Sequence, residues 1–154
     1  MSVWSIVAAL ATIRNTDSAL VGAGSFTELN LAVASGAPII ELTAPAIAFG
    51  HQLTVRHAGA PLLIQSLIGT TLSGEKKTRL FLLQNGSMLS LRGVRLASGK
   101  ASDCSECFPY GGAIFVSAGS KLQMHSVRLL DNRADMGGGA ISRLAPSSPQ
   151  PTAR

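Results

Sequence analysis

A repeated tetrapeptide is the feature that most constrains how this chain can fold. Gly-Gly-Ala-Ile occupies residues 111–114 and returns at residues 138–141, an interval of 27 positions (138 − 111 = 27). A glycine pair allows a bend that a Cβ atom would obstruct, and the Ala-Ile that follows can begin an inward-facing strand. Repeats with a period of about 20 to 50 residues are typical of solenoids. Each copy is therefore predicted to open one turn of a stacked solenoid.

A longer alignment supports the same interpretation. When the chain is shifted by 33 positions (118 − 85 = 33), residues 85–99 fall over residues 118–132, and residues 80–84 fall over residues 113–117. The aligned segments share glycine, serine and leucine positions and a Val-Arg-Leu triplet. Two successive coils are expected to stack in this register.

A third, fainter copy aligns at a different interval. Residues 50–57 fall over residues 86–93 when the chain is shifted by 36 positions (86 − 50 = 36). Unequal intervals combined with similar strand patterns indicate that loops vary in length while strands are kept, as they do in solenoid repeats.

Apolar and polar side chains alternate within each copy. Leu89 and Leu91 share one side of the chain and Ser90 and Arg92 take the other, and a period of two residues predicts β-strands. The connections of two to four residues are too short for a crossover helix. We predict an all-β fold, a parallel β-helix solenoid of about four coils. Its expected core includes Leu89, Leu91, Val94, Leu96, Leu122, Met124, Val127 and Leu129.

The segment before the coils predicts a short amphipathic helix over residues 25–36. Ser25 or Thr27 can serve as its N-cap, Glu28 lies in the first turn, and Gly36 ends it. Such a helix would cover the open end of the solenoid, where backbone groups otherwise lack partners.

The other segments complete the predicted organisation of the chain. Residues 37–143 are assigned to the β-helix domain, residues 144–154 to a disordered tail rich in Pro and Ser, and residues 1–24 to an N-terminal segment of uncertain structure. No second cap is visible after the last repeat. The chain is therefore expected to be a fragment of a longer protein, with an edge that can pair end to end with another copy.

The repeats resemble those of a known family. The segments "LTVRHAG", "TRLFLLQNGSMLSLRGVRLASG", "GGAIFVSAGSKLQMHSVRLLDN" and "GGGAI" are similar to the right-handed parallel β-helix of the pectin-lyase-like superfold, with repeats of the polymorphic outer-membrane-protein type. That family alternates Gly-Gly-Ala-Ile with Phe-x-x-Asn; here residues 129–132 read Leu-Leu-Asp-Asn. The resemblance covers roughly residues 37–143. It implies a non-enzymatic, adhesin-like scaffold that is secreted or lies at the cell surface.

The amino-acid composition limits which kinds of binding partner are expected. Of 154 residues, 14% are charged and the net charge is +5, spread along the chain, which does not favour nucleic acid. The apolar run at residues 4–13 is too short to cross a membrane. The expected partners are an acidic polysaccharide or another surface protein, and no cofactor is expected.

Enzymatic β-helices need carboxylates that this sequence does not gather. Residues 15–17 read Asn-Thr-Asp, as in one polygalacturonase signature, but the other carboxylates of that chemistry are missing. A lyase would need several carboxylates for calcium; only Asp131 and Asp135 lie near each other, and Asp131 is expected to shape a turn. No catalytic residue is predicted. The alternative is a carbohydrate-active enzyme, a polysaccharide lyase or glycoside hydrolase, whose catalytic coils lie outside these residues.

Histidine and cysteine predict no metal site. His51, His57 and His125 lack ligand spacing within one element, and Cys104 and Cys107 are only half of a zinc site. We expect the two cysteines in an accessible loop, without metal.

That loop is longer than its counterpart in the next coil. Leu96 and Gly111 are 15 positions apart (111 − 96 = 15), whereas Leu129 and Gly138 are 9 apart (138 − 129 = 9). Excursions of this kind often carry recognition.

Outward basic residues align into a candidate binding face. In the alignments Arg56, Arg92 and His125 share one column, and Arg95 and Arg128 share the next. Guanidinium groups match the geometry of carboxylate and sulfate, so this ladder is the predicted site for an anionic ligand such as a uronate-rich or sulfated glycan. A merely solvated face is the alternative.

Overall fold

The part of the chain that the structure describes contains three parallel sheets of four or five strands, a two-stranded sheet and one short helix. The computed structural model describes residues 20–56, 60–102 and 109–144. Sheet A has the order β1-β2-β5-β8-β12, sheet B the order β3-β6-β9-β13, and sheet C the order β4-β7-β11-β15. A small fourth sheet pairs β10 (Lys100–Ala101) with β14 (Arg133–Ala134). Every pairing between described strands is parallel.

The strands are short, as the alternating sequence pattern predicts. Sheet A contains β1 (Leu20–Ala23), β2 (Ile39–Leu42), β5 (Pro61–Gln65), β8 (Met88–Arg92) and β12 (Lys121–His125). Sheet B contains β3 (Ala46–Ala48), β6 (Thr71–Ser73), β9 (Arg95–Ala97) and β13 (Arg128–Leu130). Sheet C contains β4 (Leu53–Val55), β7 (Phe81–Leu83), β11 (Ile114–Val116) and β15 (Ile141–Arg143).

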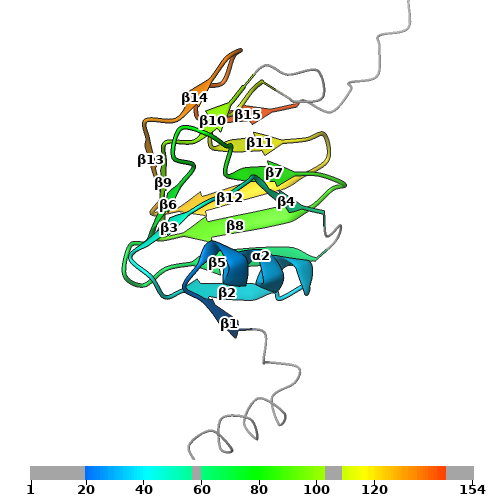
Figure 1. Cartoon of the computed structure of the whole chain (residues 1–154). Helices are drawn as coiled ribbons and strands as arrows, with labels where there is room; N and C mark the ends of the chain where they lie inside the picture. Colours follow the sequence, from blue (N-terminus) through cyan, green and yellow to red (C-terminus); the bar gives the residue numbers. More distant parts are fainter. Residues whose placement is uncertain (1–19, 57–59, 103–108, 145–154) are drawn as a thin grey trace, which may run out of the picture.

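The chain visits the three sheets in a fixed order. It passes through sheets A, B and C and then returns to sheet A one strand further along; the described residues make this circuit four times, beginning at β2, β5, β8 and β12. We call these circuits coils one to four. The colours of Figure 1 follow this stacking, from the blue end at β1 to the orange end at β14 and β15. The architecture is consistent with a β-solenoid.

The strand register confirms two of the three predicted intervals. Leu89 pairs with Leu122 and Leu96 with Leu129, which is the interval of 33. The two Gly-Gly-Ala-Ile copies lie directly on each other at the interval of 27: Gly111 N donates to Gly138 O at 2.9 Å, and Ile114 pairs with Ile141. The repeated letters therefore mark neighbouring coils.

The interval of 36 is wrong. Leu53 of β4 pairs with Phe81 of β7 in sheet C, whereas Leu89 of β8 pairs with Leu62 of β5 in sheet A. The alignment had matched strands from two different sheets. It did so because alternation defines which side chains point inward and does not define the sheet to which a strand belongs.

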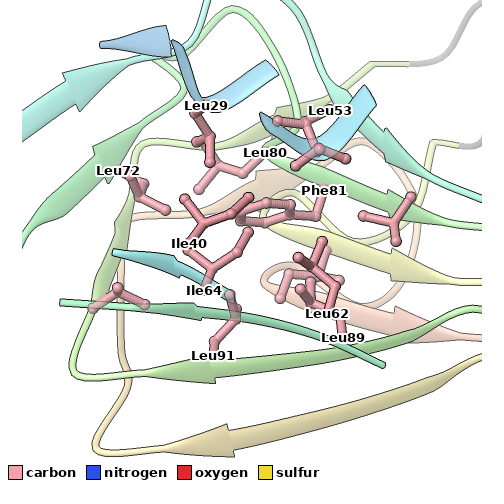
Figure 2. Packing of buried hydrophobic residues seen from close by; sticks show 14 of the residues in the cluster. Leu29, Ile40, Leu53, Leu62, Ile64, Leu72, Leu80, Phe81, Leu89 and Leu91 are labelled. Atoms are coloured by element: carbon pink, nitrogen blue, oxygen red, sulfur yellow. The ribbon is translucent and has the colours of Figure 1, made fainter. Parts of the chain in front are cut away.

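The predicted core is half right. Leu89, Leu91, Val94 and Leu96 of coil three are buried, and Figure 2 shows Leu91 beside Ile64 and Leu89 beside Leu62. Their counterparts in coil four point inward in the same register, but Leu122 and Val127 are only partly buried, while Met124 and Leu129 are exposed. Among the described residues no further strand lies beyond coil four to cover them.

The expected helix is present as α2 (Phe26–Ala34). Ser25 is its N-cap, and the Ser25 hydroxyl accepts a hydrogen bond from Glu28 N at 3.2 Å. The carboxylate of Glu28 in turn accepts one from Gly24 N at 2.6 Å. Gly36 follows with a φ of 80°, a left-handed conformation that suits a glycine after a helix end. The buried side of the helix, Leu29, Ala32 and Val33, belongs to the same core as the coils.

The first glycine of each tetrapeptide is required by its backbone conformation. Gly111 has a φ of 64° and Gly138 a φ of 72°, which L-residues rarely adopt. A Cβ atom at Gly111 would also overlap the carbonyl oxygen of Ile114. The predicted bend is confirmed at these positions.

Part of the segment left uncertain by the sequence, residues 1–24, forms β1 at the edge of sheet A. Residues 1–19 and 145–154 lie outside the described residues, as does most of the predicted tail. In the part of the chain that the structure describes, no helix has the length and apolar character needed to span a bilayer.

Candidate functional site

Four of the five predicted ligand residues form two stacked pairs. Arg92 at the end of β8 pairs with His125 at the end of β12 in sheet A. Arg95 at the start of β9 pairs with Arg128 at the start of β13 in sheet B. All four side chains are exposed. The structure therefore shows a short basic ladder on coils three and four.

Arg56 does not belong to this ladder. The column that contains Arg92 and His125 continues on coil two with Gln65, and the column of Arg95 and Arg128 continues with Thr71. Arg56 follows β4 in sheet C. The interval of 36 had matched β4 with β8, a strand of sheet A. Its placement in the ladder was wrong.

Arg56 instead lines a groove on the outer side of sheet C. The groove has a volume of about 490 Å³ and draws its walls from coils one, two and three. Four of its lining residues are basic: Arg56, Lys77, Arg79 and Lys100. The others are His51, Gln52, Thr54, Thr78, Leu82, Gln84, Ala101 and Ser102. None of these lining residues, all in the described part of the chain, carries a carboxylate.

Arg79 is the fixed member of the groove. Its side chain is 6% exposed. The guanidinium group donates from Nε to Gly111 O at 3.0 Å and from the two terminal nitrogens to Tyr110 O at 2.9 Å and to the Gln52 side chain at 2.8 Å. It also lies over the ring of Phe115, 5.5 Å from the ring centroid. Burial lowers the pKa of Arg79 from its ordinary value, because the charged form loses hydration.

The sequence around Arg79 accounts for this position. The residue stands two positions before β7, and Leu80, which lies between them, is fully buried. The backbone of Leu80 is bonded into coil three, with Leu80 N donating to Ala113 O at 3.1 Å. The guanidinium group therefore points toward the Gly111 bend. Its hydrogen bond to Gly111 O links the segment before β7 to the repeated tetrapeptide.

The other basic groups stand at the rim of the groove. Arg56 donates from Nε to the Gln84 side chain at 3.2 Å. The Lys77 ammonium group lies 4.0 Å from the carboxylate of Glu75, an exposed pair that contributes little to stability. Lys100 belongs to β10 at the start of the longer loop, and its backbone N donates to Thr78 O at 2.9 Å. The start of that loop therefore forms one wall of the groove.

A smaller hollow of about 380 Å³ lies beside Lys100, on the side of β10 and β14. It contains both Asp131 and Asp135 together with Lys76 and Arg133. Asp131 has a φ of 54° between β13 and β14, so its predicted role in a turn is confirmed. Its carboxylate lies 3.9 Å from Lys76, so this hollow has mixed charge.

The two described histidines, His51 and His125, lie beside or in strands of different sheets. His51 precedes β4, and its ring Nδ1 lies 2.8 Å from Gln52 O, whereas His125 ends β12 in sheet A. Within residues 20–56, 60–102 and 109–144, no group of three or more His, Cys, Asp or Glu could hold a metal ion. His57, Cys104 and Cys107, and residues 15–17, lie outside the described residues, so the predictions about them stay predictions.

The groove as a unit was missed by sequence reasoning. Its basic residues come from three coils, and only Arg56 had been singled out. The available signal was the local density of cations in "EKKTR", residues 75–79, within a chain that has few charges.

In comparisons with known proteins, no family model, no curated protein and no solved structure matches the chain.

Proposed function

We propose that this chain is a right-handed parallel β-helix of the pectin-lyase-like type, and that α2 caps the first coil. Three observations support the proposal. The chain passes through the three parallel sheets in constant order. The two Gly-Gly-Ala-Ile copies lie in register. Leu29, the most buried residue of α2, belongs to the same core as the strands of the coils.

The proposed role is a non-enzymatic scaffold, a part of an adhesin-like protein that is secreted or lies at the cell surface. The proposed ligand is an acidic polysaccharide, bound in the groove on sheet C. The groove itself carries this proposal: four basic side chains line one hollow whose described lining contains no carboxylate.

The chemistry of the groove fits such a ligand. An extended glycan with uronate or sulfate groups presents anions at intervals, and the basic groups of the groove are likewise spread over three coils. Arg79 supplies a positive charge that is held in place, so no side-chain entropy is lost there on binding. Arg56 and Lys100 at the rim can adjust to the ligand. The pairs Arg92 with His125 and Arg95 with Arg128 stay a second predicted binding face for an anionic ligand.

Retention on heparin and alginate columns tests the groove against the ladder. One variant carries Arg56→Ser, Lys77→Ser and Lys100→Ser; the other carries Arg92→Ser, Arg95→Ser and Arg128→Ser. Both variants lose the same formal charge, so a difference between them reports position. Arg79 is left unchanged because its hydrogen bonds also hold the Gly111 bend.

The groove variant is expected to elute at clearly lower salt than the wild type, and the ladder variant close to it. Retention of the wild type should itself fall steeply with salt, because the contacts are between exposed charges. Equal losses in both variants would mean that only net charge matters. A wild type that neither column retains would remove the polysaccharide proposal altogether.

A further inference from the structure

The end of the solenoid formed by coil four is an open apolar surface. Inward-facing side chains that would be core residues in any other coil are exposed there, among them Met124 and Leu129. A hollow of about 430 Å³ opens between sheets A and C. Its apolar lining residues are Val116, Leu122, Met124 and Ile141, and Lys121, Gln123 and Arg143 also line it. We call this surface the coil-four end.

The backbone at this end also offers hydrogen bonds. Lys121 N donates to Ser87 O and His125 O accepts from Gly93 N, so these residues of β12 face β8. In a parallel strand alternate residues face opposite sides, and the peptide groups of Leu122 and Met124 therefore point away from the sheet. Among the described residues, β12 is an edge strand whose outer side has no partner strand.

The opposite end of the same sheet presents the matching edge. β1 pairs with β2 on one side only, and Ala23 O accepts from Thr43 N, so the peptide groups of Leu20 and Gly22 point outward. Leu20 is 59% exposed and Leu31, on the outer side of α2, is 62% exposed. β1 runs parallel to every other strand of sheet A. We call this surface the β1 end.

The two ends differ in charge. Residues 20–55 contain Glu28 and Glu41 and no Lys or Arg. Residues 120–144 contain the basic residues Lys121, Arg128, Arg133 and Arg143 against Asp131 and Asp135. Two coil-four ends brought together would repel, whereas a coil-four end and a β1 end attract.

We propose that copies of this chain stack head to tail, with β1 of one copy added beside β12 of the next. Sheet A then continues across the junction as one parallel sheet, and the β1 end with α2 covers the apolar hollow of the coil-four end. Such a contact uses two different surfaces, so it leaves a free end on each side and permits open-ended growth. The occupant of the coil-four end is thus a second copy, selected by strand direction, apolar surface and charge.

Sedimentation of the whole chain over a range of concentrations tests the stacking. Two blocked variants are used: Met124→Lys places a charge in the coil-four end, and Leu20→Lys places one in the β1 end. Both positions are exposed, so the monomer fold should persist, which circular dichroism verifies. Ile68→Lys is the matched control, because Ile68 is a 61% exposed apolar residue in the loop between β5 and β6, away from both ends.

The wild type and Ile68→Lys are expected to show average masses that rise with concentration and pass beyond the dimer. Each blocked variant alone should remain monomeric. An equimolar mixture of the two should form dimers and stop there, because each variant retains one functional end and the two ends are complementary.

Three results would overturn the proposal. A wild type that stays monomeric at every concentration shows no stacking. A blocked variant that still self-associates shows that the contact lies elsewhere. A mixture that fails to form dimers shows that the contact does not join a β1 end to a coil-four end. All three readouts are independent of polysaccharide binding, so the groove proposal can fail without affecting this one.

Discussion

Coils three and four have nearly the same sequence pattern and very different burial. Leu96 and Leu129 are direct partners in sheet B, yet Leu96 is 0% exposed and Leu129 is 37% exposed. Leu91 and Met124 are partners in sheet A, with 1% and 44% exposed. Side-chain direction is the same in both coils; what differs is that coil three has a coil on each side.

Side-chain direction and burial are two separate properties of an inward residue in this fold, although one sequence pattern predicts both. Alternation determines which side of a strand an apolar residue occupies, whereas burial in a solenoid depends on the neighbouring coil. In coil four the inward residues lie against coil three and have open space on the other side. The contribution of an inward residue to stability should therefore depend on its coil.

The pair Leu96→Ala and Leu129→Ala tests this dependence with the largest expected effect. Truncation of Leu96 leaves a cavity enclosed by two coils and should lower the free energy of unfolding by about 3 kcal/mol. Truncation of Leu129 removes a side chain that is already exposed on one side and should cost less than about 1 kcal/mol. Urea denaturation in dilute solution, where copies are separate, measures both. Equal losses would mean that coil four is covered as fully as coil three.

The second glycines of the two tetrapeptides offer the same comparison in the backbone. A Cβ atom at Gly112 would overlap the carbonyl oxygen of Arg133 and lie 2.6 Å from Gly139 O, whereas a Cβ at Gly139 meets nothing nearer than Asn132 O at 3.6 Å. Gly112→Ala should destabilise by about 2 kcal/mol because backbone atoms must move. Gly139→Ala should be neutral or slightly stabilising. Thermal denaturation of both variants decides; a harmless Gly112→Ala would show that the coils can separate locally.

Asn132 is a polar contact that coil four makes with coil three. Its side chain donates to Leu96 O at 2.9 Å and accepts from Gly99 N at 2.8 Å. Asn132→Ala leaves both backbone groups without that partner and should cost about 1 kcal/mol. Asn132→Asp is the control, because a carboxylate can still accept from Gly99 N and cannot donate to Leu96 O. Denaturation should rank the stabilities as wild type, Asn132→Asp, Asn132→Ala; the same stability for all three would make the bridge unimportant.

The stacked arginines should have the smallest effect. Arg95 and Arg128 are exposed partners of like charge, so Arg95→Ser should raise the stability at low salt by less than about 0.5 kcal/mol. Screening should abolish the gain at high salt. Melting curves at two salt concentrations measure it, and a destabilised variant at low salt would show that the arginine stem contributes packing that outweighs the repulsion.

Sequence reasoning succeeded where repeated letters came from strands of one sheet. The pairings of Leu89 with Leu122 and of Ile114 with Ile141 follow from identical residues at matching positions. It failed where the pattern is common to all strands, which is why Arg56 was assigned to the wrong column. The helix over residues 25–36 was predictable because Ser25 and Gly36 have specific backbone roles.

The groove could not be found from sequence in this way. Its walls come from residues that are distant along the chain, such as Arg56, Lys77 and Lys100, and they meet only when coils of unequal length are stacked. The position of Arg79 depends in addition on the carbonyl groups of Tyr110 and Gly111, which the sequence does not indicate. Which side chains of different coils meet is determined by how the coils stack, and a single coil's sequence does not indicate it.

The constant order of the three sheets also has a consequence for synthesis. Paired residues are separated by one coil of chain, from 19 positions for Leu20 with Ile39 (39 − 20 = 19) to 33 positions for Met88 with Lys121 (121 − 88 = 33). Each coil therefore finds its complete template in the segment that left the ribosome just before it. Because each strand pairs with a strand of the preceding coil, the coils can form in order from β1 onward while the chain is being synthesised.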